Sequence, residues 1–227
     1  MRKIQFVPGE YYHVYSRGND KCTIFRSHYD YARFLFLILY FQSPFSVYNV
    51  GNAAAYFIKH QVFNIRGSRK EQLFKNRLVS LVNFTQMPNH FHLTLLERVK
   101  NGISSYMQRV LNAYAKYFNT RYERSGHLFE APFQAVHIED NEQLLYLSAY
   151  VHRNQREIKK WKNREHLYPW SSYQDYIREN RWGELIEPGI VLKQFSSKSE
   201  YKDFVETSGA KDKLPDDVFI DYQTPGV

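Results

Sequence analysis

Cysteines and long apolar runs are scarce in this sequence. Only one cysteine, Cys22, occurs among 227 residues, which excludes an internal disulfide framework and a cysteine-rich zinc site. The longest apolar run, residues 34–41, is far too short to cross a bilayer, and residues 1–8 lack the apolar core of a signal peptide. Internal repeats and low-complexity tracts are also absent. These features predict a soluble, cytoplasmic protein with no membrane partner.

The charged residues are unbalanced in favour of the basic ones. The chain has 31 Lys and Arg against 23 Asp and Glu, giving a net charge of +8 and a pI near 9.4. This excess favours a polyanionic partner, although charge alone does not separate DNA from RNA or an acidic membrane surface. Aromatic residues make up 17% of the chain, and many lie beside Lys or Arg. That mixture suits base stacking combined with phosphate neutralisation, while most of the rings must form the core.

The apolar pattern predicts an α+β fold in the order β-α-β-β-α-β-α. The expected strands are residues 11–16, 78–85, 90–96 and 128–138, and the expected helices are 30–42, 102–122 and 140–160. This order is the split β-α-β pattern of a ferredoxin-like antiparallel sheet, with one additional C-terminal helix. Residues 86–89 are expected to form a hairpin turn, Ser104 and Ser105 to cap the second helix, and Asp140 and Asn141 to cap the third.

The same pattern predicts how the chain is divided. A main domain is expected over residues 1–162, with a polar, irregular insertion at about 44–76. A C-terminal extension over residues 163–227 begins basic and aromatic and then becomes mixed in charge. Within it, residues 170–173 are expected to pack the extension onto the core.

Two histidines flank Phe91 at the start of the strand expected at 90–96. Because side chains alternate along a strand, His90 and His92 share one face, about 6–7 Å apart, and Phe91 points to the other. Two imidazoles in this arrangement can chelate one divalent metal ion. An isolated pair suits packing or hydrogen bonding at a strand end equally well, so the rest of the sequence must decide.

The last predicted helix carries a second set of chemically useful residues. Tyr146, Tyr150 and Asn154 follow one another at four-residue spacing and therefore lie near one helical stripe. Tyrosines on such a stripe commonly belong to the core, whereas a buried asparagine needs hydrogen bonds for its amide. Its carbonyl oxygen is a suitable ligand for Mg²⁺ or Mn²⁺. Packed against the histidine face, this helix would bring a phenol and an amide oxygen to the same metal ion.

Five motifs in a fixed order resemble those of a known family. They are YHVYSRGN at 12–19, MPNHFH at 87–92, GHLFE at 126–130, YVHRN at 150–154 and WSSY at 170–173. In this order the sequence resembles the IS200-like single-tyrosine transposases, most closely the REP-associated tyrosine transposases, over roughly residues 8–180. The chain departs from the family pattern at two points. Phe91 is large for the position between the histidines, and Gln155 follows Asn154 where relatives commonly have proline.

The resemblance implies a site and a reaction. The HUH motif, two histidines around a hydrophobic residue, would lie on a central strand, and His90, His92 and Asn154 would hold Mg²⁺ or Mn²⁺. Tyr150, on the additional helix, would attack a phosphodiester to give a 5′-phosphotyrosine and a free 3′-hydroxyl, which can later rejoin strands. The implied partner is single-stranded DNA near palindromic hairpin repeats. Some relatives exchange the tyrosine helix between protomers, so a homodimer belongs among the expected assemblies.

Other residues compete for these roles or could support them. The alternative nucleophiles are Tyr146, Tyr114, Tyr117 and Tyr122. His127, His137 and His152 could assist proton transfer or contact phosphate, but a structural or surface role is the main expectation for each. His13, in the first strand, is expected to be an ordinary sheet residue. The residues expected to contact DNA are Arg17, Asn19, Arg66, Arg69, Lys70 and Arg153.

Three other functions fit parts of the sequence. A domesticated DNA-binding protein would keep the fold without turnover. A ferredoxin-like RNA-binding module would carry an aromatic-glycine signature on its strands, which this sequence lacks. A metal-dependent hydrolase using water as nucleophile would call for further carboxylate or histidine ligands, which the motifs do not contain.

Overall fold

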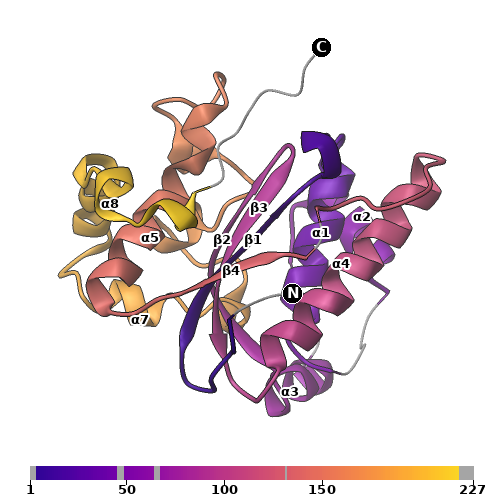
Figure 1. Cartoon of the computed structure of the whole chain (residues 1–227), viewed down its shortest axis with the longest axis horizontal. Helices are drawn as coiled ribbons and strands as arrows, with labels where there is room; N and C mark the ends of the chain where they lie inside the picture. The colour runs from indigo at the N-terminus through magenta and orange to yellow at the C-terminus, as the bar shows by residue number, and fades with distance from the viewer. Residues whose placement is uncertain (1–3, 45–48, 64–66, 131, 220–227) are drawn as a thin grey trace.

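One four-stranded antiparallel sheet organises the chain. The computed structural model describes residues 4–44, 49–63, 67–130 and 132–219. Its strands are β1 (Tyr11–Arg17), β2 (Val79–Met87), β3 (His90–Glu97) and β4 (Gln134–His137). They lie in the order β2-β3-β1-β4, so β3 is inserted between β1 and β2 (Figure 1). This order confirms the predicted mixed fold with an antiparallel sheet split by a β-α-β crossover.

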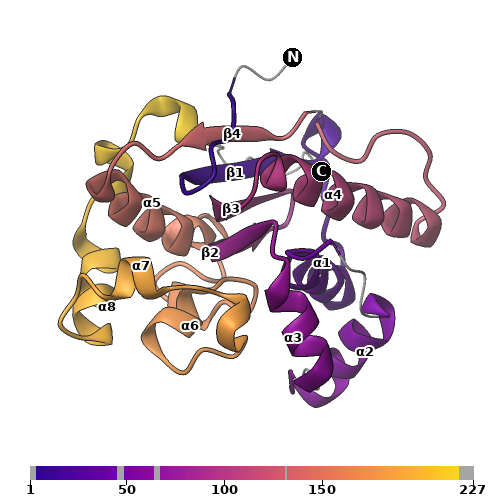
Figure 2. The same ribbon diagram turned by 90° about the horizontal axis from the view of Figure 1, so that it is seen from below.

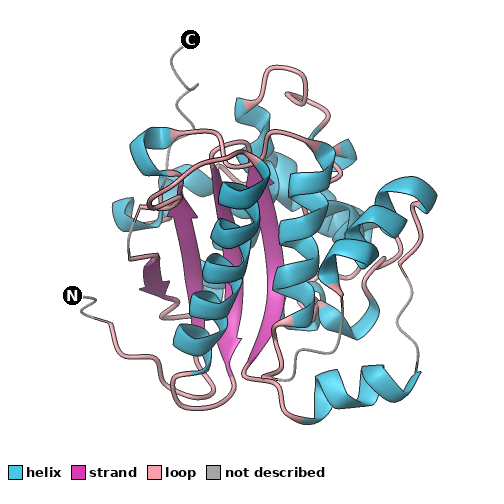
Figure 3. Ribbon diagram, turned by 90° about the vertical axis from the view of Figure 1, so that its right-hand side faces the viewer, coloured by secondary structure: helices cyan, strands magenta, loops and turns pink. Residues whose placement is uncertain are grey.

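Helices cover both faces of the sheet. The main helices are α1 (His28–Tyr40), α2 (Val50–His60), α3 (Gly67–Lys75), α4 (Gly102–Arg121) and α5 (Asn141–Arg153). The C-terminal helices are α6 (Tyr173–Ile177), α7 (Gly189–Leu192) and α8 (Lys198–Thr207). Helices α1 and α4 lie on one face, and α5 to α8 lie on the other (Figures 2 and 3). No helix among the described residues is long and apolar enough to cross a membrane.

Alternation along β3 separates an apolar layer from a polar one. Phe91, Leu93 and Leu95 are fully buried in the core beneath α1 and α4. The intervening His90 and His92 are just as deeply buried but face α5. A second apolar core on that side joins α5 to the C-terminal helices. The histidines therefore lie in a buried polar layer between the sheet and α5.

Several predicted boundaries differ from the structure. The segment 44–76, expected to be irregular, contains α2 and α3. Val50, Ala54 and Phe57 of α2 are buried, and the mostly small residues between them gave only a weak apolar pattern. Only residues 134–137 of the expected strand 128–138 belong to β4. Helix α5 ends at Arg153 rather than near 160 and continues as a 3₁₀ turn over Asn154–Glu157.

The helix starts illustrate two kinds of cap. At α5 the predicted cap is confirmed, because the Asp140 carboxylate accepts the N–H of Gln143 at 2.7 Å. At α4 the predicted serine caps are wrong. The Glu97 carboxylate accepts the N–H groups of Gly102 and Ile103 at 2.9 and 2.6 Å instead. A side chain at Gly102 would collide with the carbonyl oxygen of Leu78, so the helix has to begin with glycine here.

The motif at 170–173 attaches the C-terminal segment to the sheet, as predicted. The N–H of Ser172 donates to the carbonyl of Phe84 at 3.0 Å, and the N–H of Gln86 donates to the carbonyl of Trp170 at 2.9 Å. These bonds pair the motif with β2, which is an edge strand. The C-terminal segment thereby satisfies backbone groups that an open edge would expose.

His152 connects α5 to this motif and to α8. Its Nδ1 lies 2.6 Å from the hydroxyl of Tyr201, and its Nε2 lies 2.8 Å from Oγ of Ser172. The rings of Tyr173 and Tyr176 cover the imidazole on its other sides. Burial lowers the pKa of His152 to about 3, so the ring is neutral in the folded protein.

We expect His152→Gln to flatten the dependence of folding stability on pH. In the unfolded chain His152 takes up a proton below about pH 6.5, whereas in the folded chain it does not until about pH 3, so stability falls as pH drops through this window. Removing this imidazole should reduce the slope of the unfolding free energy against pH by about 1.4 kcal/mol per pH unit near pH 5. Urea unfolding at several pH values between 7 and 4 measures this slope. The exposed His127, changed to Gln, is the control, and equal slopes in both variants would contradict the assignment.

Candidate catalytic and metal site

The protonation of His90 is determined by its neighbour in the hairpin turn. Asn89 donates from Nδ2 to the carbonyl of Lys21 at 3.3 Å, so its Oδ1 faces Nδ1 of His90 at 2.8 Å. Because Oδ1 only accepts, Nδ1 of His90 must carry the hydrogen. Burial lowers the pKa of His90 to about 3, so the ring is neutral and its Nε2 bears a lone pair.

Asn154, at the end of α5, faces this lone pair. Its Oδ1 lies 3.1 Å from Nε2 of His90, and its Nδ2 is buried without a partner among the described residues. Two acceptors at this distance repel each other unless the amide turns its NH₂ group toward His90 or a cation lies between them. Two neighbouring ligands at about 2.1 Å from an octahedral cation are themselves about 3 Å apart. The separation therefore fits two ligands of one divalent ion.

His92 adds a second buried nitrogen to the same place. Its ring is perpendicular to that of His90, with the ring centres 5.0 Å apart. Nδ1 of His92 is hydrogen-bonded to Nε2 of His13 at 2.9 Å, and Nε2 of His92 has no partner in the described part of the chain. The described residues contain no cluster of three or more His, Cys, Asp or Glu able to hold a metal. The donor set that fits a cation is therefore two imidazoles and one amide oxygen.

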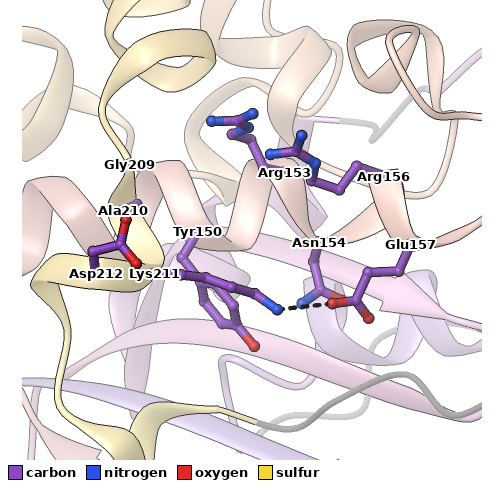
Figure 4. Close-up of a pocket in the computed structure, with 9 residues that line it drawn as sticks. All are labelled: Tyr150, Arg153, Asn154, Arg156, Glu157, Gly209, Ala210, Lys211 and Asp212. Atoms are coloured by element: carbon purple, nitrogen blue, oxygen red, sulfur yellow. Dashed lines mark hydrogen bonds and ion pairs between the residues drawn. The ribbon is translucent and has the colours of Figure 1, made fainter.

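Tyr150 lies one helical turn before Asn154. Its ring meets that of His92 edge-on at 5.4 Å, and Phe219 packs against its other side at 5.1 Å. The phenol and the Asn154 amide point to the same side of α5 (Figure 4). Only 3% of Tyr150 is exposed, so residues near the C-terminus cover the site in this structure.

A cavity of about 170 Å³ lies beside Tyr150 and is rich in basic groups (Figure 4). Arg153, Arg156 and Lys211 line it together with Glu157 and Asp212. Lys211 forms an ion pair with Glu157 at 3.0 Å and thereby links the C-terminal segment to the turn after α5. Burial, followed by the charge of Arg156, lowers the pKa of Arg153. The cationic excess around this cavity suits an anionic group such as a phosphate.

The competing tyrosines lie elsewhere. Tyr146 packs against Phe204 of α8. The three tyrosines of the 114–122 segment are on the opposite side of the sheet: Tyr114 donates to the carbonyl of Ile24 at 2.6 Å, and Tyr117 and Tyr122 donate to Asp30 at 2.6 and 2.7 Å. Burial raises the pKa of Tyr114 and of Tyr117, which opposes phenolate formation there. Of the five candidate tyrosines, Tyr150 is the one whose ring contacts His92 in the described part of the chain.

The residues predicted to contact DNA are dispersed. Arg17 forms an ion pair with Glu130 at 3.0 Å, Asn19 is exposed, and Arg153 lines the cavity beside Tyr150. Arg66 lies outside the described residues, as do the side chains of Arg69 and Lys70. Helix α3 is at the end of the sheet opposite His90 (Figure 1).

Sequence analysis missed the role that the structure suggests for His13. The residue was expected to be an ordinary sheet residue, yet it contacts His92 directly. The alternation along β1 indicates that His13 shares a face with Tyr11 and Tyr15. It does not indicate that His92 lies beside this face, because the strand next to β1 depends on the sheet order. The other histidines match expectation: His127 is exposed, His137 bonds to Glu10, and His152 is a structural link.

Comparison with known proteins supports the predicted resemblance. The family model described as "Transposase IS200 like" matches residues 47–154. No curated protein sequence matches the chain. Among solved structures, the REP-associated tyrosine transposase bound to a REP hairpin is similar in fold, with a TM-score of 0.52 at 12% identity. The match covers 87% of this chain and 95% of that one. The predicted relationship to the IS200-like transposase family is therefore confirmed.

Proposed function

We propose that the chain cleaves and rejoins single-stranded DNA, with Tyr150 as the nucleophile. The observation that carries this proposal is the polar layer in which Tyr150, His92, His90 and Asn154 meet between β3 and α5. The phenol ring lies 5.4 Å from the ring of His92, and Nε2 of His90 lies 3.1 Å from Oδ1 of Asn154. A nucleophile next to a set of metal-ligand atoms is the arrangement that phosphoryl transfer to a side chain requires.

The proposed reaction is a transesterification. The phenol oxygen of Tyr150 attacks the phosphorus, the bond from phosphorus to the 3′ oxygen breaks, and the phenol proton ends on that oxygen. The products are a 5′-phosphotyrosine and a free 3′-hydroxyl. In the reverse sense, a 3′-hydroxyl attacks the adduct and restores both the phosphodiester and the phenol. Neither step consumes water or a nucleotide cofactor.

His90, His92 and Asn154 would hold the divalent cation, Mg²⁺ or Mn²⁺. When bound, the ion would polarise the phosphodiester and stabilise the charge on its oxygens. Lys211 extends to the same side of α5 as the phenol and would attract the phosphate, whereas Arg153 and Arg156 line the cavity from the other side (Figure 4).

The proposed substrate is single-stranded DNA next to a hairpin, and the structurally similar transposase is bound to a REP hairpin. A cluster of arginines and aromatic rings at the active end of the sheet supports this choice. The arginine–aromatic cluster consists of Arg26, Arg33, Tyr29, Tyr117, Phe118, Arg121, Tyr122 and Arg124. It lies where α1 begins and α4 ends, and β1 and β3 place both points at the same end as His90.

The charges of this cluster are not balanced internally. Its acidic partner, Asp30, is fully buried and accepts the phenols of Tyr117 and Tyr122 together with two backbone N–H groups. The guanidinium of Arg26 lies 4.7 Å from the centre of the Tyr122 ring, and that of Arg121 lies 5.2 Å from the Tyr29 ring. Stacking holds these groups at the surface, where they can meet DNA phosphates.

We expect Tyr150→Phe to abolish a covalent adduct with DNA, because the ring is kept and only the attacking oxygen is lost. End-labelled single-stranded DNA carrying a palindromic repeat would be incubated with Mg²⁺ or Mn²⁺ and resolved on a denaturing gel. Tyr146→Phe, on the same helix, is the matched control and should keep the adduct. An adduct mapped to Tyr114, Tyr117 or Tyr122 would refute this nucleophile. Hairpin binding without any adduct would favour the DNA-binding function without turnover.

We expect Asn154→Asp to raise the affinity for Mn²⁺ by about tenfold and Asn154→Leu to lower it by at least as much, because the first adds a charged oxygen ligand and the second removes the oxygen. Isothermal titration calorimetry of the DNA-free protein measures both. Asn112→Asp, which adds the same charge at an exposed position of α4, is the control. Equal affinities in the two Asn154 variants would show that this amide is not a ligand.

We expect the double change Arg26→Gln and Arg121→Gln to weaken hairpin binding and to reduce the slope of log affinity against log salt by about two. Fluorescence anisotropy across a salt series measures this slope. The control removes the same net charge at the other end of the sheet, through Lys75→Gln and Lys100→Gln, both exposed. A larger loss of hairpin affinity in the control would show that the DNA binds at the opposite end of the sheet from the one proposed.

A further inference from the structure

His13 and His92 form a buried pair of imidazoles on neighbouring strands. In the β1–β3 register, His13 is opposite Thr94 and Tyr15 is opposite His92, so the two histidines are diagonal neighbours on one face. Their ring planes are nearly parallel, at 11°, with the ring centres 5.1 Å apart. Nε2 of His13 lies 2.9 Å from Nδ1 of His92, and both residues are fully buried.

Only one hydrogen can lie between these two nitrogens. Both imidazoles are fully buried, where the neutral form is favoured, and a neutral imidazole carries a single N–H. If His92 donates from Nδ1, its Nε2 has a lone pair and can bind a cation. If His13 donates from Nε2 instead, the hydrogen of His92 is on Nε2, and that nitrogen cannot be a ligand. The direction of one hydrogen bond therefore decides whether the metal site exists.

We propose that His13 is a positioning residue: it accepts the hydrogen bond from Nδ1 of His92 and so holds His92 in the tautomer whose Nε2 can bind the cation. This inference rests on the proposed metal site. It gives His13 a function in the reaction without contact to DNA or to the ion.

The proposed metal site selects this direction. Nε2 of His92 and Nδ1 of His13 are both buried without a hydrogen-bond partner in the described part of the chain, so each direction leaves one of them with an N–H that no described group accepts. A cation at Nε2 of His92 needs a lone pair there, which places the hydrogen of His92 on Nδ1 and makes His13 the acceptor. Oγ1 of Thr94, opposite His13 in the β1–β3 register, is also buried without a partner among the described residues, and a hydroxyl can accept as well as donate.

The same direction also agrees with His90. There, Asn89 directs the hydrogen to Nδ1 and leaves the lone pair on Nε2. With His13 as acceptor, His92 has the same tautomer, and the perpendicular rings of His90 and His92 both offer Nε2 lone pairs. An acceptor on the far nitrogen of a metal-binding histidine is the usual way in which proteins orient such ligands.

The experiment combines two readouts on wild type, His13→Gln and His13→Leu. Imidazole ¹⁵N NMR of the metal-free protein reports which nitrogen of His92 carries the hydrogen. Calorimetry with Mn²⁺ reports affinity. The glutamine keeps a side-chain oxygen that can accept from His92, whereas the leucine has no acceptor.

We expect wild type and His13→Gln to have the hydrogen on Nδ1 of His92 and to bind Mn²⁺ within a few-fold of each other. His13→Leu should lose about 10- to 100-fold in affinity. A wild-type His92 protonated on Nε2, or wild-type Mn²⁺ affinity in His13→Leu, would overturn the inference. If His13→Leu fails to fold, the NMR result on wild type and the glutamine variant still decides. Absence of Mn²⁺ binding by a wild type with the expected tautomer would refute the metal site and leave the hydrogen-bond direction supported.

Discussion

A polar layer is buried between the sheet and α5, and the surrounding elements are arranged to keep it there. His13, His90 and His92 are removed from water there together with the Asn154 amide. Burial lowers the pKa of all three imidazoles, so the rings stay neutral. Burying such polar groups costs free energy unless they form hydrogen bonds with one another. The atoms left over, Nε2 of His92 and the facing pair of His90 and Asn154, are the ones that a cation would satisfy.

The C-terminal segment belongs to the scaffold of this layer. It pairs with β2 through the motif at 170–173, and His152 ties that motif to α5 and α8. Helix α5 carries both Tyr150 and Asn154, so the contacts that hold α5 on the sheet also determine how the phenol faces His92. The position of the Tyr150 phenol is thus coupled to the folding of the C-terminal segment that contains α6 and α8.

Local patterns predicted much of this arrangement, and non-local pairing accounts for what they missed. Alternation along β3 was enough to place His90 and His92 on one face, and four-residue spacing was enough to align Tyr150 with Asn154. The turn at residues 88–89 and the Asp140 cap are also local and were predicted. The contact of His13 with His92 depends on β1 lying next to β3, 79 residues away, which no local period encodes. Helix α2 was not predicted because the residues between Val50, Ala54 and Phe57 are mostly small and give a weak periodic signal.

The departure from the family pattern at residue 155 shows how this chain ends α5 without proline. Proline stops a helix because it lacks an N–H and its ring excludes the helical conformation of the preceding residue. Gln155 is fully buried, and its Nε2 donates to the carbonyl of His152 at 2.6 Å and to that of Glu165 at 3.1 Å. It thereby satisfies a carbonyl that the helix end leaves open. Its Oε1 accepts from Thr85, which is opposite His92 in the β2–β3 register. The glutamine therefore both ends the helix and ties Asn154 to the strands that carry the histidines, so the substitution preserves the geometry on which the proposed site depends.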